Sequence, residues 1–138
     1  MIKIDITNSK LFDSLLDISY EKSSHYDLHN DFDLKSINYE KLNNIFIFNF
    51  IEIKGKRIVS LVFEDVKILS FNLPVNEKDL TLDNFHRGRF EYENQLYDEY
   101  NSKKCFYMEF YEEGNINFLC SKATLEIKTH IKVINFKA

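Results

Sequence analysis

A short basic cluster lies between acidic residues in the stretch LDNFHRGRFEYE (82–93), in a chain that is acidic overall. Arg87 and Arg89 are two residues apart, so in a strand they lie on one face, where two guanidinium groups could bind an anion. Gly88 between them would let a ligand approach the backbone. The same spacing also has a structural interpretation, in which Arg87, Arg89 and Glu91 form a charged strand face that pairs across strands. We favour this interpretation, with a contribution to a ligand or partner surface as the alternative.

Nucleophilic catalysis at this cluster would need a serine or cysteine beside a base such as His86. No feature of the sequence places the nearest candidates, Ser102 and Cys105, next to that base. The chain also lacks a Walker loop, the GxGxxG and GxSxG motifs and a CxxC pair. We therefore expect a protein that is not an enzyme and has no cofactor. An enzyme centred on His86 with Arg87 or Arg89 ranks last among the functions considered.

The stretch HYDLHNDFD is the best candidate for a metal site in the sequence. It combines two imidazoles with three carboxylates: His25, Asp27, His29, Asp31 and Asp33. The His-x3-His spacing would put both imidazoles on one face of a helix, where carboxylates could complete a site. However, the stretch has neither a HExxH pattern nor a helical apolar period, and Asp, Asn and His also favour turns. We predict a solvated loop and no metal site.

The charge of the chain is unevenly distributed. The net charge is −4, but the window 91–113 alone holds seven acids and two bases, a net −5. Tyrosines alternate with these acids, and tyrosine-rich surfaces are typical of protein interfaces. An exposed sheet edge in an aromatic-rich chain would have the same composition. The residues predicted to bind a partner are Glu91, Glu93, Tyr97, Asp98, Glu99, Tyr100, Glu112 and Glu113.

The elements that must position these residues are predicted to be strands, because apolar and polar side chains alternate with a period of two. Predicted strands cover 2–6, 42–53, 85–93, 105–112, 115–128 and 131–136. The run 57–73 is predicted to form two strands, or one bent strand, broken near Glu64 and Asp65. The run 42–53 is apolar on both faces and predicts a central strand covered on both sides. Turns are expected at 54–57 and at 112–115, where Gly114 can adopt a positive φ. A polar loop or short helical turn is expected at 94–104.

One short helix is predicted near the N-terminus, in SKLFDSLLDISYEK (9–22), because Leu11, Phe12, Leu15 and Leu16 would share a helical face. A strand at LLDISYE is the alternative. The resulting fold is mainly β, an antiparallel sheet curled into a sandwich or half-barrel with this one helix, and an α+β fold is the alternative.

The composition fits a single domain over residues 1–138. It includes 13 Phe and 8 Tyr but 3 Gly and 1 Pro, and aromatic residues favour sheet. Cys105 and Cys120 lie in apolar runs and are expected to be buried thiols, with a disulfide as the alternative if their strands are neighbours. No N-terminal export segment and no apolar run of membrane-spanning length is found, so we expect a cytoplasmic protein that does not enter the membrane.

Five stretches, in order, carry a resemblance to a known class: SLLDISYE, LNNIFIFNF, SLVFEDVKILSF, LDNFHRGRFE and FYMEFYEEGNINFLCSKATLEI. Together they resemble small β-rich bacterial immunity-type proteins, which are encoded beside polymorphic and contact-dependent toxins. The resemblance covers most of the chain and implies a cytoplasmic protein that binds and neutralises one cognate toxin domain. It implies no catalytic residues.

The charge distribution agrees with this class of function. A nuclease toxin needs a basic cleft to hold phosphate, and an acidic inhibitor surface would speed association with it. The chain has no basic stripe of its own, which argues against direct binding of nucleic acid. The alternative function is a small-ligand-binding β-barrel or sandwich without catalytic activity, whose pocket would be lined by Phe and Tyr residues.

Overall fold

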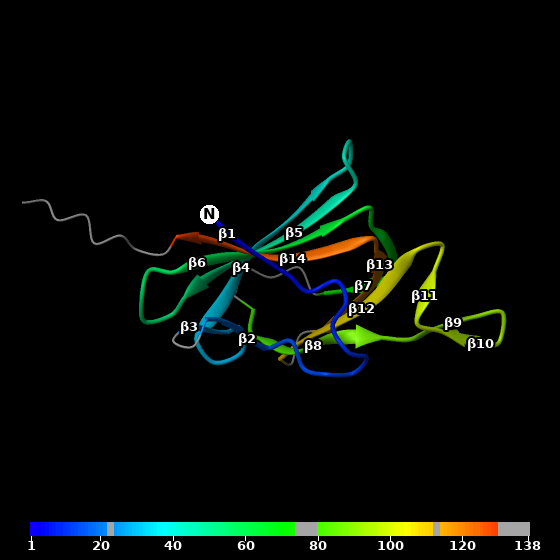
Figure 1. Ribbon diagram of the computed structural model, residues 1–138, viewed down its shortest axis with the longest axis horizontal. Coiled ribbons are helices and arrows are strands. Elements are labelled where there is room, and N and C mark those ends of the chain that lie inside the picture. The colour runs from blue at the N-terminus through cyan, green and yellow to red at the C-terminus, as the bar shows by residue number, and fades with distance from the viewer. Residues whose placement is uncertain (22–23, 74–79, 112–113, 130–138) are drawn as a thin grey trace, which may run out of the picture.

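The computed structural model describes residues 1–21, 24–73, 80–111 and 114–129 (Figure 1). Within these ranges the chain forms strands and no α-helix, and the sheets are antiparallel, which confirms the prediction of a mainly β fold. The same ranges contain no helix with the length and apolar character needed to cross a membrane. The strand predicted at 131–136 lies outside the described residues.

Two sheets of five strands each make up most of the molecule. Sheet A has the order β1 (Ile2–Asp5), β14 (Lys122–Thr129), β6 (Ile58–Glu64), β5 (Ile45–Glu52) and β4 (Phe32–Glu40). Sheet B joins β11 (Glu99–Tyr100), β12 (Lys103–Phe110), β13 (Gly114–Cys120) and β7 (Lys67–Asn72), and β8 (Leu82–Gly88) also pairs with β12. Two short hairpins pair β2 (Asp17–Tyr20) with β3 (Ser24–Asp27), and β9 (Phe90–Tyr92) with β10 (Gln95–Tyr97).

Phenylalanine side chains from both sheets fill one shared core. Successive side chains of a strand point to opposite faces, so Phe46, Phe48 and Phe50 of β5 all point inward and are at most 1% exposed. From sheet B, Phe118 meets them across the interior, with ring centroids 5.8 Å from Phe46 and 4.6 Å from Phe63 of β6. Aromatic contacts therefore join the two sheets to each other, while backbone hydrogen bonds join the strands within each sheet.

The second face of β5 differs from the prediction of a strand covered on both sides. β5 does lie between β4 and β6, but Ile51 on this face remains 36% exposed. The face is organised by polar side chains: the Asn49 amide donates to Ser36 Oγ (2.9 Å), and Ser60 Oγ donates to Asn49 Oδ1 (2.6 Å). Hydrogen bonds between polar side chains of neighbouring strands thus stabilise this face, although its isoleucines are only partly buried.

The chain crosses between the sheets at two adjacent points. Residues 57–73 form two strands, the first of the two predicted arrangements, with Asp65 in a left-handed conformation (φ 56°) where β6 of sheet A leads into β7 of sheet B. The predicted strand 115–128 is likewise two strands, because the chain returns to sheet A after β13. At this return Ser121 donates its backbone N–H to Glu64 O (3.0 Å), which ties the two crossings together.

The predicted helix at 9–22 is wrong for the described residues 9–21. Instead, this segment covers the free edge of β8: the N–H groups of Phe12 and Leu15 donate to Arg87 O and Phe85 O, each at 2.8 Å. The alternative prediction, a strand in LLDISYE (15–21), is correct, because β2 forms within that stretch. The helical pattern failed because an open sheet edge offers these backbone groups hydrogen bonds, while Leu15 still reaches the core.

Truncation of Phe118 should show how far the fold depends on contacts between the sheets. We expect Phe118→Ala to lower the free energy of unfolding by about 3–5 kcal/mol, the range for a fully buried aromatic side chain. Phe71→Ala is the matched control, since Phe71 lies on β7 but is 50% exposed. Urea unfolding measures both, and equal losses for the two variants would contradict this account of the core.

A second test concerns Gly114, which was predicted to be free to adopt a positive φ and has φ 127°. A Cβ at this position would collide with the carbonyl oxygen of Asn72, so Gly114→Ala should destabilise by more than about 1 kcal/mol. Gly88→Ala is the control, because its added Cβ would come no closer than 3.7 Å to the His86 ring. A thermal melt in which Gly114→Ala matches the wild type would show that the backbone here can relax.

Candidate functional site

The outer face of sheet B carries a second, smaller apolar cluster, separate from the main core. Alternation along β12 and β13 turns Cys105 and Leu119 outward, and Phe90 of β9 covers them. These three side chains are at most 8% exposed, and Tyr97 and Tyr100 pack against them. The cluster attaches the β9–β10 hairpin to the sheet, and Figure 1 shows this hairpin projecting at one end of the molecule.

Residues 94–104 form hairpins, which corrects the prediction of a polar loop or helical turn. Glu93 and Asn94 (φ 49° and 63°) make the two-residue turn between β9 and β10. Asn101 and Ser102 (φ 51° and 63°) make the same kind of turn between β11 and β12. Two consecutive positive φ values are the mark of a type I′ turn, for which asparagine is favoured. The Asn in each turn was the available sequence signal.

Three tyrosines gather on these hairpins. The ring of Tyr100 lies 5.4 Å from Tyr92 and 5.9 Å from Tyr97, measured between centroids. Phe90 lies 6.1 Å from Tyr100 in an edge-on arrangement. The pKa of Tyr100 is raised, first by neighbouring Tyr92 and also by the negative charge of Glu93. Tyr97 and Tyr100 therefore have two roles, because they pack on the small cluster and also present part of their rings to solvent.

The predicted acidic residues are not equivalent in the structure. Asp98 pairs with Arg89 (Nε to Oδ1 2.7 Å), and the Arg89 guanidinium also lies 5.5 Å over the Phe12 ring. Among the described residues, Glu91, Glu93 and Glu99 form no ion pair. Glu112 and Glu113, also predicted, lie outside the described residues.

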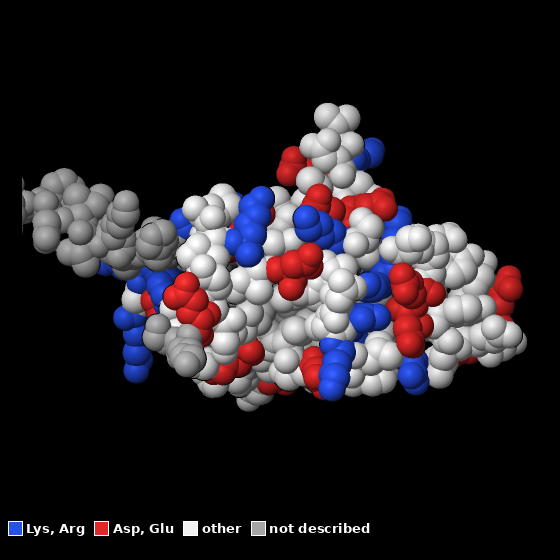
Figure 2. Space-filling view, viewed as in Figure 1, with Lys and Arg blue, Asp and Glu red and all other residues white. Residues whose placement is uncertain are grey.

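We call the six described residues of this prediction the hairpin patch: Glu91, Glu93, Tyr97, Asp98, Glu99 and Tyr100. The structure brings them together on β9, β10, β11 and the residues that join these strands. In the space-filling view the projecting end is largely uncharged surface with acidic atoms near its tip (Figure 2). Of the two lysines that start β12, Lys103 pairs with Asp65 (3.3 Å) and Lys104 donates to Asn8 Oδ1.

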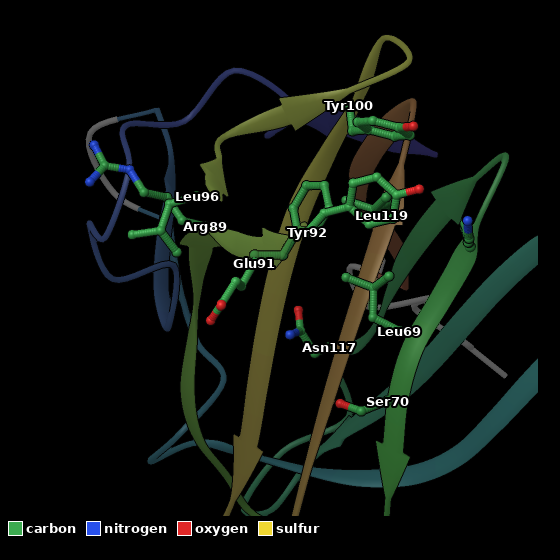
Figure 3. A pocket seen from close by; sticks show the side chains of 11 residues that line it. Leu69, Ser70, Arg89, Glu91, Tyr92, Leu96, Tyr100, Asn117 and Leu119 are labelled. Carbon is green, nitrogen blue, oxygen red and sulfur yellow. The ribbon is translucent and has the colours of Figure 1, made fainter. Parts of the chain in front are cut away.

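A groove of about 550 Å³ lies between the hairpins and β7 (Figure 3). Its lining comes from β7 (Lys67, Leu69, Ser70), β13 (Asn117, Leu119) and the hairpin region (Arg89, Phe90, Glu91, Tyr92, Leu96, Tyr100). Leu96 is 66% exposed and Tyr92 46% exposed, which is high for large apolar side chains. Sequence reasoning missed this groove, because its two walls come from strands far apart in the chain.

Arg87 and Arg89, which suggested an anion site, have different partners in the structure. Arg87 lies opposite Phe106 on β12 and donates from Nη1 to Ser9 O (2.8 Å), whereas Arg89 pairs with Asp98. His86 lies between the rings of Phe12 (5.9 Å) and Tyr107 (5.4 Å). Burial lowers the pKa of His86, and Glu109 partly opposes this shift. Each basic side chain thus has a structural partner of its own.

The stretch from His25 to Asp33 runs from β3 through a turn into β4, so its two histidines do not share a helix face. The Asp27 carboxylate accepts hydrogen bonds from the backbone N–H groups of His29 (3.1 Å) and Asn30 (3.0 Å). His29 Nδ1 lies 2.8 Å from Leu82 O. In the described part of the chain no three His, Cys, Asp or Glu side chains gather as a metal site would require.

The two cysteines lie on neighbouring strands, yet they face opposite sides of sheet B. Cys105 is paired in register with Leu119, so Cys120, the next residue, points to the other face and into the main core. Both are free thiols. Burial raises the pKa of Cys105 to about 11 and that of Cys120 to about 12, so neither is a thiolate near neutral pH.

Thiol reactivity therefore provides a direct test of this geometry. We expect both cysteines to react slowly with a disulfide reagent at pH 8 in the native protein, because they are buried and protonated, and to react rapidly after unfolding in guanidinium. Absorbance of the released thiolate measures both rates. A rapid native phase that the Cys105→Ser variant abolishes would show that the hairpin leaves this thiol accessible.

Comparison of the chain with protein-family models, with curated proteins and with solved structures finds no match. The functional interpretation therefore depends on the chemistry of the hairpin patch and of the groove beside it.

Proposed function

We propose that this chain is an immunity-type binding protein, which holds a cognate bacterial toxin domain and neutralises it in the cytoplasm. The observation that carries the proposal is the hairpin patch, in which acids and tyrosines share one projecting unit. The resemblance of the sequence to small β-rich immunity-type proteins supports the same class of partner.

The open carboxylates favour a basic partner. Glu91, Glu93 and Glu99 have no ion pair among the described residues, so their charge is available to a partner. An acidic surface steers a basic protein toward it and raises the rate of association. Nuclease toxins are one class with such a surface, because they bind the phosphate backbone of nucleic acid.

The tyrosines supply contact area at low entropic cost. Tyr92, Tyr97 and Tyr100 hold one another in place through ring contacts at 5.4 and 5.9 Å, so little side-chain freedom remains to be lost on binding. Rigid aromatic side chains are the usual anchors of protein interfaces. A patch of ordered tyrosines flanked by free acids therefore suits a specific, tight complex.

We also propose that the protein has no catalytic activity of its own. In the described residues the thiols are buried and protonated, and His86 lies between two aromatic rings without a nucleophile hydrogen-bonded to it. These features do not suit nucleophilic catalysis, which requires a nucleophile and a base within hydrogen-bond reach of each other.

The second candidate function is the binding of a small ligand, which the groove volume of about 550 Å³ favours, since ligand pockets span roughly 300–1,000 Å³. Phe and Tyr residues were expected to line such a pocket, and Phe90, Tyr92 and Tyr100 line this groove, but most of the other described phenylalanines pack in the core. For this reason we rank protein binding first. A ligand retained through purification and released on unfolding, detected by mass spectrometry, would reverse the order.

Charge reversal tests the proposed partner surface. We expect Glu93→Lys/Glu99→Lys to leave thermal stability unchanged, because exposed charges contribute at most about 1 kcal/mol. The same change should slow association with the toxin domain encoded beside the gene by about tenfold at low salt, since steering acts on the on-rate. Stopped-flow mixing at several salt concentrations measures this rate, and a toxin-protection assay gives the biological effect.

The matched control is Glu21→Lys/Glu40→Lys, which makes the same change of net charge outside the hairpin patch. Both positions are exposed, and Glu21 shares the left-handed backbone of Glu93 (φ 59° and 49°). Equal slowing by both variants would assign the effect to total charge. An unchanged on-rate for the Glu93/Glu99 variant would remove the hairpin patch as the partner surface.

A further inference from the structure

Leucine side chains from three strands line the groove beside the hairpin patch. Leu119 forms part of it at 2% exposure, while Leu69 on the β7 side and Leu96 on the hairpin side are 36% and 66% exposed. Large apolar side chains that converge on a concave surface and remain exposed are a mark of binding sites. The exposed area of Leu69 and Leu96 is therefore the feature that an occupant of the groove would cover.

Polar atoms in the groove are few and directional. Figure 3 shows the hydroxyl groups of Tyr92 and Tyr100 pointing the same way, toward the β7 side, with the Asn117 amide in the groove between the strands. Asn117 Oδ1 already accepts the Cys105 thiol (3.1 Å), which leaves the amide N–H groups for another acceptor. Backbone carbonyls that flank an inserted side chain would be suitable acceptors for these donors.

The groove is close to neutral, whereas its surroundings are acidic. Lys67 and Glu91 on its walls carry opposite charges, and the third charged residue of the lining, Arg89, is neutralised by Asp98. An uncharged group therefore suits the groove itself. Glu93 and Glu99 of the neighbouring hairpin patch, which form no ion pair among the described residues, suit positive charges on either side of that group.

We propose that the groove receives one large apolar side chain, aromatic or leucine, that projects from the basic partner surface. This inference rests on the proposed function and specifies how the partner is anchored. The volume of about 550 Å³ can hold one such side chain together with part of its backbone, within the range for binding pockets. An apolar anchor in a pocket, ringed by further contacts that exclude water from it, is the arrangement of an interface hot spot.

Capped tripeptides provide a probe that does not need the partner. The protein has no Trp, so the fluorescence of acetyl-Lys-Trp-Lys-amide reports its binding directly. We expect this peptide to bind with a dissociation constant in the millimolar range and to shift the methyl NMR signals of Leu69, Leu96 and Leu119. The signal of Leu42, which is 95% exposed and does not line the groove, should stay fixed.

Two further peptides separate the apolar from the charged contribution. Acetyl-Lys-Ala-Lys-amide should leave the groove methyl signals unshifted, and acetyl-Glu-Trp-Glu-amide should bind more weakly than the Lys-Trp-Lys peptide. Equal shifts with the Ala and Trp peptides, or no shift with any of them at millimolar concentration, would overturn the inference. Stronger binding of the acidic peptide would overturn the choice of a basic partner surface.

Groove variants then test the anchor in the complex itself. Leu96→Asp should raise the dissociation rate of the toxin domain by roughly tenfold or more and leave its association rate nearly unchanged, as expected for an anchor. Tyr92→Ala should act in the same direction. The matched controls are Leu42→Asp and Tyr39→Ala, because Tyr39 (47%) and Tyr92 (46%) are equally exposed.

The results distinguish failure of this inference from failure of the proposed function. If Leu96→Asp leaves dissociation unchanged while Glu93→Lys/Glu99→Lys still slows association, the hairpin patch binds the partner and the groove inference alone is wrong. If neither variant has an effect, both are wrong. If the groove variants raise the dissociation rate and the charge variant leaves the association rate unchanged, the apolar anchor is confirmed and the proposed role of the acids is wrong.

Discussion

The aromatic contact between the two sheets is the interaction on which the rest of the structure depends. Phe63 of sheet A and Phe118 of sheet B meet with ring centroids 4.6 Å apart, and Phe48, Phe85 and Phe106 lie 5.7 to 6.1 Å from Phe63. Aromatic pairs at such distances add to the free energy gained by burying their area. Because Phe106 and Phe118 fix the inner face of β12 and β13, they also fix which residues of these strands face outward. The hairpin patch and the groove are built on that outer face.

Much of the fold was predictable, because the pattern with a period of two is a local signal of sheet. The strands at 2–6 and 42–53, the break near Asp65 and the positive φ of Gly114 all agree with the structure. The helix at 9–22 was not correctly predicted, because the hydrogen bonds that decide it come from β8, far along the chain. Local periodicity does not contain that information.

The candidate site was predictable in part for the same reason. An excess of acids and tyrosines in one window is visible in the sequence, and the structure places Glu91 on β9, Glu93 in the turn that follows it and Glu99 on β11. The pairing of Asp98 with Arg89 was not foreseen, since it depends on the path of the hairpin. The groove was not foreseen either, because it exists only where the pairing of β13 with β7 brings their side chains beside the hairpin.

Sheet B also separates two apolar clusters, and this separation has an evolutionary consequence. The main core lies on one side, and the small cluster of Phe90, Cys105 and Leu119 lies on the other. A hydrogen-bonded sheet therefore separates the exposed residues of the hairpin from the main core, so the effects of mutations there on stability should be nearly independent of those in the core. A lineage can then exchange hairpin residues one at a time, and so alter the proposed partner surface, while the same scaffold continues to fold.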